Sequence, residues 1–423
     1  MMFRTAALTM VFGFLVACGD DEEPSGGGGN GSGAAGPIPT EGSLFAVSST
    51  VFTTDGTSSD TEVSIRPSLA SEEVFQTLEI TGPGSIFGIE RQSRFFAALN
   101  ESGNVRRYDL GEDGRIEPTG EIGFGAFGIN SFFSQGLAFL SDELAVLIDN
   151  ATLQAIRWNP TTMRIIGEPE SLAPTLAPLA EADGGGALTL VLNPSGQRRD
   201  NGVVFFGYFV DNVNERLGAS TVAIFVDGES GALAIDSDDR CGGGFFSAET
   251  SDGTLYVGPD PYATSLKVID DTQPDACYLR VLAGENTFDR SFSGSATEVV
   301  ANATIGGLAA GPGGSDAYVF ALPQETAIPD ATDFATRSEL IYAFTPWSLR
   351  RIRLGDTLSE AEAPTGFDEL SAFTGVQRVD GDSYLFVAAE DFSSTRFIST
   401  STTAEPDDVG AVSGGVFGAL RVR

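Results

Sequence analysis

The sequence predicts an all-β protein built as a single β-propeller, with seven blades as the expected count. Three observations carry this prediction. Short apolar or aromatic runs recur seven times, beginning roughly every 50 to 65 residues. Further strand-like runs and polar turns follow them, and apolar residues scarcely ever recur with the 3.6-residue period of a helix. Four short strands per unit, separated by turn residues, are typical of a propeller blade.

Each of the seven runs opens one predicted unit. They span Ser43–Ser49, Arg94–Asn100, Glu143–Asp149, Gly202–Val210, Thr254–Asp260, Asp316–Leu322 and Ser383–Ala389. Second and third strands follow within the units, and "TSLKVIDDTQ" (264–273) is expected to be one of the second strands. A Gly-rich segment such as "GFGAFGINSFF" (123–133) or "CGGGFFSAE" (241–249) then leads into the next unit. We expect these segments to be the innermost strands, because small side chains let backbones approach closely at the axis.

The end of the chain is expected to close the ring. The first unit lacks an innermost strand, whereas "GGVFGALRVR" (414–423) is left over as a strand. Pairing the two would remove two exposed sheet edges. A pair of β-sandwiches or a β-helix is the alternative architecture, and it stays open because the spacing of the units is irregular.

The first residues have the pattern of an export signal. Arg4 supplies a positive charge, and the apolar segment Ala6–Ala17 is too short to span a bilayer comfortably. Leu15, Val16, Ala17 and Cys18 resemble the lipobox of bacterial lipoproteins, in which the cysteine thiol takes a diacylglycerol. We therefore predict that Cys18 is lipidated and becomes the first mature residue. Ordinary secretion, with cleavage near Ala17, is the alternative.

Three segments are predicted from this pattern. Residues 1–17 are a lipoprotein signal peptide, residues 18–42 are the lipidated cysteine with a flexible Gly/Ser/acidic linker, and residues 43–423 are the propeller domain. Gly19, rather than aspartate, follows the cysteine, which removes a familiar signal for retention in the inner membrane. The expected location is the bacterial outer membrane, with its periplasmic and cell-surface faces both open.

Charge and composition exclude several kinds of protein. The chain has 59 Asp and Glu residues against 24 Lys and Arg residues, a net charge of −35, which would repel nucleic acid and anionic lipid. It has no histidine, which excludes histidine bases, Ser-His-Asp triads and histidine-ligated metals. We accordingly predict no catalytic residues and no cofactor.

The remaining cysteines are an even pair, Cys241 and Cys277. In an exported protein such a pair most simply forms a disulfide, with two separate buried thiols as the alternative.

Other motifs have structural interpretations. "GFGAFG" (123–128) fits the dinucleotide-binding pattern but precedes a strand-like run rather than a helix. Lys267, the only lysine, lacks the glycines of a phosphate loop. Acidic residues cluster at three places and have the oxygen ligands that calcium prefers, although turns in hairpins are the simpler explanation. They are Asp236, Asp238 and Asp239; Asp270 and Asp271; and Asp380 and Asp382. Bound structural calcium is the alternative interpretation of these clusters, and no residue is predicted as a metal ligand.

Segments at 106–133, 154–167 and 277–289 resemble the myxobacterial MxcI-type lipoproteins, which occur beside siderophore genes. The resemblance covers most of the chain after Gly42 in order and spacing. Its motifs are Arg107-Tyr108, Trp158-Asn159-Pro160, Cys277 with Leu279-Arg280, and Phe288-Asp289. For Trp158-Asn159-Pro160 we prefer a structural interpretation, a strand's aromatic residue that enters a turn. The resemblance implies a lipid-anchored propeller of the cell envelope with a connection to iron acquisition, and it transfers no catalytic residue.

Three functions follow as hypotheses. The first is a non-enzymatic binding or scaffold lipoprotein that presents loops to an envelope protein, a glycan or a small ligand. The second is a calcium-dependent propeller hydrolase of the lactonase type, which requires a ring of convergent carboxylates in the channel. The third is capture of a ferric siderophore, which requires arginines clustered against the negative charge of the chain.

Overall fold

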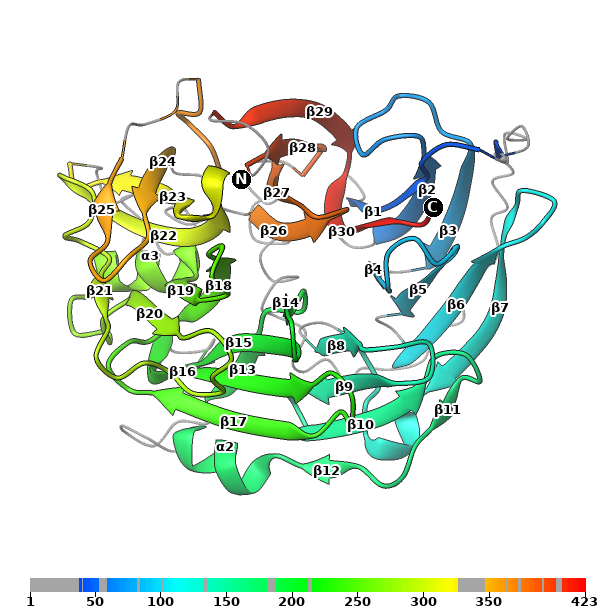
Figure 1. The fold of residues 1–423 in the computed structure, drawn as a ribbon, viewed down its shortest axis with the longest axis horizontal. Coiled ribbons are helices and arrows are strands. Elements are labelled where there is room, and N and C mark those ends of the chain that lie inside the picture. The colour runs from blue at the N-terminus through cyan, green and yellow to red at the C-terminus, as the bar shows by residue number, and fades with distance from the viewer. Residues whose placement is uncertain are drawn as a thin grey trace, which may run out of the picture.

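The computed structural model describes residues 38–423 except 40, 53–58, 82–83, 100–101, 133–134, 181–187, 212–214, 326–346, 362–363, 365, 372–373, 390–391 and 401–404. The strands form seven antiparallel sheets, five of four strands and two of five strands. The sheets surround a central axis (Figure 1), which confirms the predicted seven-bladed propeller.

We number the blades in chain order and write each from its innermost strand outward. Blade one is β30 (Gly415–Arg421), β1 (Phe45–Phe52), β2 (Ser59–Arg66) and β3 (Gln76–Thr81). Blade two is β4 (Gly84–Phe87), β5 (Arg94–Leu99), β6 (Asn104–Leu110) and β7 (Ile116–Gly123). Blade three is β8 (Gly136–Phe139), β9 (Ala145–Asp149), β10 (Gln154–Asn159) and β11 (Arg164–Ile165), with β12 (Glu170–Ser171) also pairing with β10.

The other four blades repeat the pattern. Blade four is β13 (Thr189–Leu192), β15 (Gly202–Asp211), β16 (Arg216–Asp227) and β17 (Leu233–Asp238), with the short β14 (Gln197–Arg199) also pairing with β15. Blade five is β18 (Gly244–Glu249), β19 (Leu255–Pro259), β20 (Cys277–Val281) and β21 (Gly294–Ser295). Blade six is β22 (Ala303–Ala310), β23 (Asp316–Pro323), β24 (Ser348–Arg353) and β25 (Ser359–Glu360). Blade seven is β26 (Thr374–Val379), β27 (Asp382–Ala388), β28 (Ser394–Ser399) and β29 (Asp407–Ser413).

The seven apolar runs all become the second strand of a blade. These strands are buried on both faces, because neighbouring blades pack against each side of a blade; every residue of β9 is buried, for example. Strands buried on both faces have continuous rather than alternating apolar sequences. For this reason the second strands were the clearest signal in the sequence.

The C-terminal strand closes the ring, as predicted. β30 pairs antiparallel with β1, from Phe45 opposite Arg421 to Thr50 opposite Gly415, and becomes the innermost strand of blade one. In Figure 1 the red C-terminal strand lies beside the blue N-terminal strand. The chain enters the propeller slightly earlier, at Ile38, which is 3% exposed and donates its backbone N–H to the carbonyl of Gly114 (3.3 Å).

The Gly-rich segment at 123–128 is not an innermost strand, and this prediction was wrong. β7 ends at Gly123, a single 3₁₀ turn, η1 (Gly125–Phe127), follows, and the innermost strand of blade three starts only at Gly136. Phe124 is fully buried against Phe132 and Trp158, which holds this loop in place. The Gly-rich segment 241–249 does contribute an innermost strand, β18, and glycines also precede or belong to the innermost strands β4, β13 and β22.

The segment 264–273 was also predicted wrongly, because most of it belongs to a helix rather than a strand. α3 (Pro261–Ile269) is inserted between β19 and β20 of blade five. Asp260 caps it, since its carboxylate accepts the backbone N–H of Tyr262, and Pro261 occupies the first turn. Asp followed by Pro is a helix start signal. A second helix, α2 (Ala173–Ala180), precedes blade four, and within the described ranges neither helix is long and apolar enough to cross a membrane.

Asp260 makes stability depend on pH. Its carboxylate is buried and accepts hydrogen bonds from the Tyr208 hydroxyl and the Tyr262 backbone N–H (3.0 Å each). Burial raises its pKa from 3.8 to about 6, and the two hydrogen bonds only partly offset this effect. The folded state therefore binds this proton more tightly than the unfolded state does. As the pH rises from 3.8 to about 6, loss of the proton lowers the free energy of unfolding.

We therefore expect Asp260→Asn to unfold like the wild type below pH 4 and to be more stable above pH 7. The asparagine keeps a helix-capping oxygen without the buried charge. The pKa difference sets an upper limit of about 3 kcal/mol on the gain. Urea unfolding of the variant and the wild type at pH 4 and pH 8 measures this gain in the free energy of unfolding. The other carboxylates are the same in both proteins, so their contributions to the pH dependence cancel in the difference. Equal stabilities at pH 8 would contradict the prediction.

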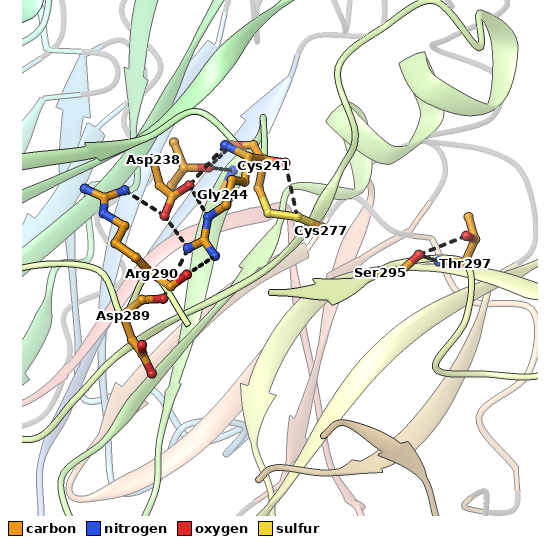
Figure 2. Close-up of a disulfide and its surroundings, with 10 residues drawn as sticks. Asp238, Cys241, Gly244, Cys277, Asp289, Arg290, Ser295 and Thr297 are labelled. Atoms are coloured by element: carbon orange, nitrogen blue, oxygen red, sulfur yellow. Dashed lines mark hydrogen bonds and ion pairs between the residues drawn. A yellow bond between two sulfur atoms is a disulfide. The ribbon is translucent and has the colours of Figure 1, made fainter. Parts of the chain in front are cut away.

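The predicted disulfide is present. Cys241 and Cys277 are bonded and join the segment after blade four to the third strand of blade five. Beside the bond, Asp238 is fully buried and forms ion pairs with Arg240 (2.6 Å) and Arg290 (2.8 Å), as Figure 2 shows for Asp238 and Arg290. The covalent bond and the ion pairs of the buried Asp238 together connect blades four and five.

Candidate functional site

A cavity of about 800 Å³ lies at one end of the central channel. It is found where the innermost strands end and turn back into the second strands. Phe87, Phe139, Glu249 and Ala310 line it, and each is the last residue of its innermost strand. All seven blades contribute to the walls, so the cavity exists only in the closed ring.

Two phenylalanines of the cavity lining lie at β-bulges. The β18–β19 register shifts between Gly244 and Phe246, which leaves Phe245 as the extra residue of its strand. The β30–β1 register shifts in the same way and leaves Phe417 as the extra residue. Phe417 is 38% exposed and Phe245 is half-buried, and both line the cavity. Bulges often re-aim a side chain next to a functional site.

The cavity also contains six charged side chains. Four are acidic, Glu90, Asp200, Glu249 and Asp252, and two are basic, Arg198 and Arg378. Arg198 lies on β14, which projects from blade four toward the centre of the ring (Figure 1), and its guanidinium donates to the carbonyl of Phe139 (2.7 Å). Arg378 lies 3.6 Å from the Glu249 carboxylate and donates to the carbonyl of Gly381 (3.0 Å).

Burial shifts the proton affinities of these groups. It raises the pKa of Glu90, an effect that a hydrogen bond from the Asp380 backbone N–H partly offsets. It also raises the pKa of Glu249, partly offset by Arg378, and it lowers the pKa of Arg198, partly offset by Glu90. All three shifts have the same physical cause, because removal from water disfavours the charged form of each group.

A hydrogen-bonded network connects the cavity rim to the start of the propeller. Glu90 accepts the backbone N–H of Asp380, and the Asp380 carboxylate pairs with Arg91 and Arg421. Arg421 donates in turn to the hydroxyl of Ser43 (2.9 Å). The chain therefore enters the propeller at the end that carries the cavity.

Four of the seven acidic residues considered for calcium pair with other groups of the protein. Asp236 accepts from the backbone N–H of Phe288 and from Arg290, and Asp270 accepts from the backbone N–H of Thr272. Asp238 and Asp380 pair with arginines as described. The other members of the clusters are their sequence neighbours Asp239, Asp271 and Asp382. Nowhere in the described part of the chain do three Asp, Glu or Cys side chains form a group that could hold a metal.

The motifs of the MxcI-type resemblance have structural contacts. Trp158 is fully buried and packs edge-on against Phe96, Phe124 and Phe139, while the Asn159 side chain accepts the backbone N–H of Thr162 in the following turn. This confirms the structural interpretation of Trp158-Asn159-Pro160. Arg280 and Asp289 form an ion pair (2.6 Å), and Phe288 is buried.

Sequence reasoning missed the cavity residues. Glu90, Arg198, Glu249 and Arg378 come from four different blades and belong to no local motif. The only sequence signal is a charged residue at or just after an innermost strand, and such residues are common in turns. The predicted lipidation site, Cys18, lies outside the described residues.

Comparisons with known proteins support the fold. No family model and no curated protein sequence matches the chain. Similar solved structures include a protein of Bacteroides fragilis assigned as a 6-phosphogluconolactonase (TM-score 0.51, 12% identity, 92% of this chain and 100% of that one). The periplasmic gluconolactonase PpgL of Pseudomonas aeruginosa is similar as well (TM-score 0.51, 11% identity, 90% and 99%). A Lactobacillus plantarum protein has a TM-score of 0.52 at 7% identity, again over 90% and 99% of the two chains.

Identities this low establish the fold and nothing about the chemistry. Fold and site together define a class: a seven-bladed β-propeller, closed by its C-terminal strand, with a polar and aromatic cavity at one end of its channel. The chain is similar to these solved propellers in architecture, and only the residues that line its cavity indicate what the cavity binds.

Proposed function

We propose that this protein is a lipid-anchored binding protein of the bacterial cell envelope, and that its central cavity holds a small ligand. The observation that carries the proposal is the cavity itself. Its volume of about 800 Å³ lies within the range of small-molecule sites, roughly 300–1,000 Å³. Exposed aromatic faces beside a few charged groups are the usual lining of such sites. The disulfide supports an exported protein, because disulfides persist in oxidising compartments.

The anchor in this proposal is Cys18, held in the outer membrane. Because the chain enters the propeller at the cavity rim, the tethered side of the domain is also the side on which the cavity lies. We expect Cys18→Ala to move the protein from the membrane fraction to the soluble fraction and to abolish labelling by a fatty-acid analogue. Cys241→Ala serves as the control and should keep both properties. Membrane retention of Cys18→Ala would contradict the anchor.

Ligand binding can be tested by filling the cavity. Ser247 is a half-buried residue of β18 that lines the cavity, and Ser247→Trp should occupy much of the space. We expect compounds that raise the melting temperature of the wild type in a screen of small metabolites to lose this effect in Ser247→Trp. The control is Glu117→Trp on the exposed outer strand β7 of blade two, which should respond like the wild type. If both variants respond alike, the cavity is not the binding site.

The calcium-dependent hydrolase is less well supported. It requires carboxylates that converge on one ion. Glu90 lies on blade two, Asp200 on blade four, and Glu249 and Asp252 on blade five. No three carboxylates among the described residues form a group that could hold a metal ion. Capture of an anionic ferric siderophore, the role implied by the MxcI-type resemblance, stays a proposal that this charge balance does not favour.

A further inference from the structure

We propose that the cavity ligand is an organic cation, an amine or a quaternary ammonium compound, held between the phenylalanines of the two bulges and the carboxylates of the cavity wall. This inference rests on the proposed function and specifies its ligand class. Three features of the described residues support it: the phenylalanines of the cavity lining, the balance of charge, and the partners that the arginines already have.

The aromatic faces are the first feature. Phe245 and Phe417 are each the extra residue of a bulge on an innermost strand, and both line the cavity. Phe417 remains 38% exposed within the cavity lining, an unusual environment for a phenylalanine on an innermost strand. The face of an aromatic ring carries partial negative charge and attracts cations such as alkylammonium groups.

The charge balance is the second feature. Four carboxylates and two guanidinium groups line the cavity, which contains neither lysine nor histidine. Burial raises the pKa of both Glu90 and Glu249, so a bound cation would relieve the cost of holding them charged. The net charge of −35 on the whole chain also raises the local concentration of cations and lowers that of anions.

The engagement of the arginines is the third feature. Arg198 donates to the carbonyl of Phe139, and Arg378 lies between the Glu249 carboxylate and the carbonyl of Gly381. An anionic ligand would need these guanidinium groups and would meet four carboxylates around them. A cation would meet more carboxylates than guanidinium groups, and both guanidinium groups already have protein partners.

The test compares three probes of similar shape and different charge. They are choline, its neutral isostere 3,3-dimethylbutan-1-ol, and the anion 3,3-dimethylbutanoate, titrated calorimetrically into the full chain carrying Cys18→Ala at low ionic strength. We expect choline to bind more tightly than the other two. Phe417→Leu and Glu249→Gln should each raise the dissociation constant for choline about threefold or more. The first removes a cation–π contact and the second removes one negative charge, and each interaction contributes a modest part of the binding free energy. Phe75→Leu, the same change outside the cavity on blade one, should leave it unchanged.

The outcomes separate this inference from the proposed function. Equal or tighter binding of the neutral or anionic probe, no binding of choline, or unchanged affinity in both Phe417→Leu and Glu249→Gln would overturn the cation proposal. If the other probes bind and Ser247→Trp abolishes their binding, the cavity remains a ligand site with a different preference. If neither these probes nor the metabolite screen distinguishes Ser247→Trp from Glu117→Trp, the proposed function fails as well.

Discussion

Deletion of residues 414–423 is expected to unfold the whole propeller domain rather than to trim its end. β30 supplies the entire innermost strand of blade one and pairs with β1 along its length. Ala419, Leu420 and Val422 are buried, and full burial of each larger apolar side chain is worth about 1.5–3 kcal/mol. The segment also accepts the backbone N–H groups of Arg91 and Ser93 in the next blade (2.8 Å each). The total loss is comparable with the 5–15 kcal/mol stability of an ordinary domain.

Circular dichroism during heating, together with the soluble yield, measures this effect. Phe417→Ser is the matched control, because it changes an exposed cavity residue of the same strand and keeps the pairing with β1. We expect this control to melt close to the wild type and the deletion to be insoluble or already unfolded at 25 °C. A deletion variant that melts like the full chain would show that closure of the ring contributes nothing.

Trp158→Ala is expected to lower the free energy of unfolding by about 4 kcal/mol, the usual cost of removing a large aromatic side chain from a core. Trp158 is fully buried, with its ring centroid 5.5 Å from Phe139 and 5.7 Å from Phe96. Its indole N–H has no hydrogen-bond partner among the described residues. Trp158→Phe, which keeps an aromatic ring, should therefore cost only about 1–2 kcal/mol.

Chemical unfolding of the two variants and the wild type measures the difference. Because Phe139 lines the cavity, Trp158→Ala should also weaken ligand binding through a shifted wall, whereas Trp158→Phe should not. If Trp158→Phe loses as much stability as Trp158→Ala, an aromatic ring at this position contributes nothing and the packing argument is wrong.

The sequence alone predicted the parts of the structure that local patterns encode. The second strands are buried on both faces and therefore have unbroken apolar sequences, so β9 and β15 were visible as runs. The surplus C-terminal strand, and the even pair of cysteines in a chain expected to be exported, predicted the closure by β30 and the Cys241–Cys277 bond, both of which the structure confirms.

Local patterns failed where several interpretations of the same residues compete. "GFGAFG" resembled the other Gly-rich innermost strands, but Phe124 is anchored in the core by Trp158, and the chain turns at η1 instead. The segment after Asp260 is apolar enough for a strand, and the Asp-Pro cap at its start makes it the helix α3.

What the sequence by itself determined is the class of fold, its number of blades, its closure and its disulfide, because these follow from the periodicity of apolar residues and from counting strands and cysteines. Only the tertiary structure decided the cavity. Glu90, Arg198, Glu249 and Arg378 meet because the ring brings the ends of distant strands together. Phe245 and Phe417 also line the cavity, each at a shift in strand register, and register belongs to a pair of strands rather than to either sequence alone.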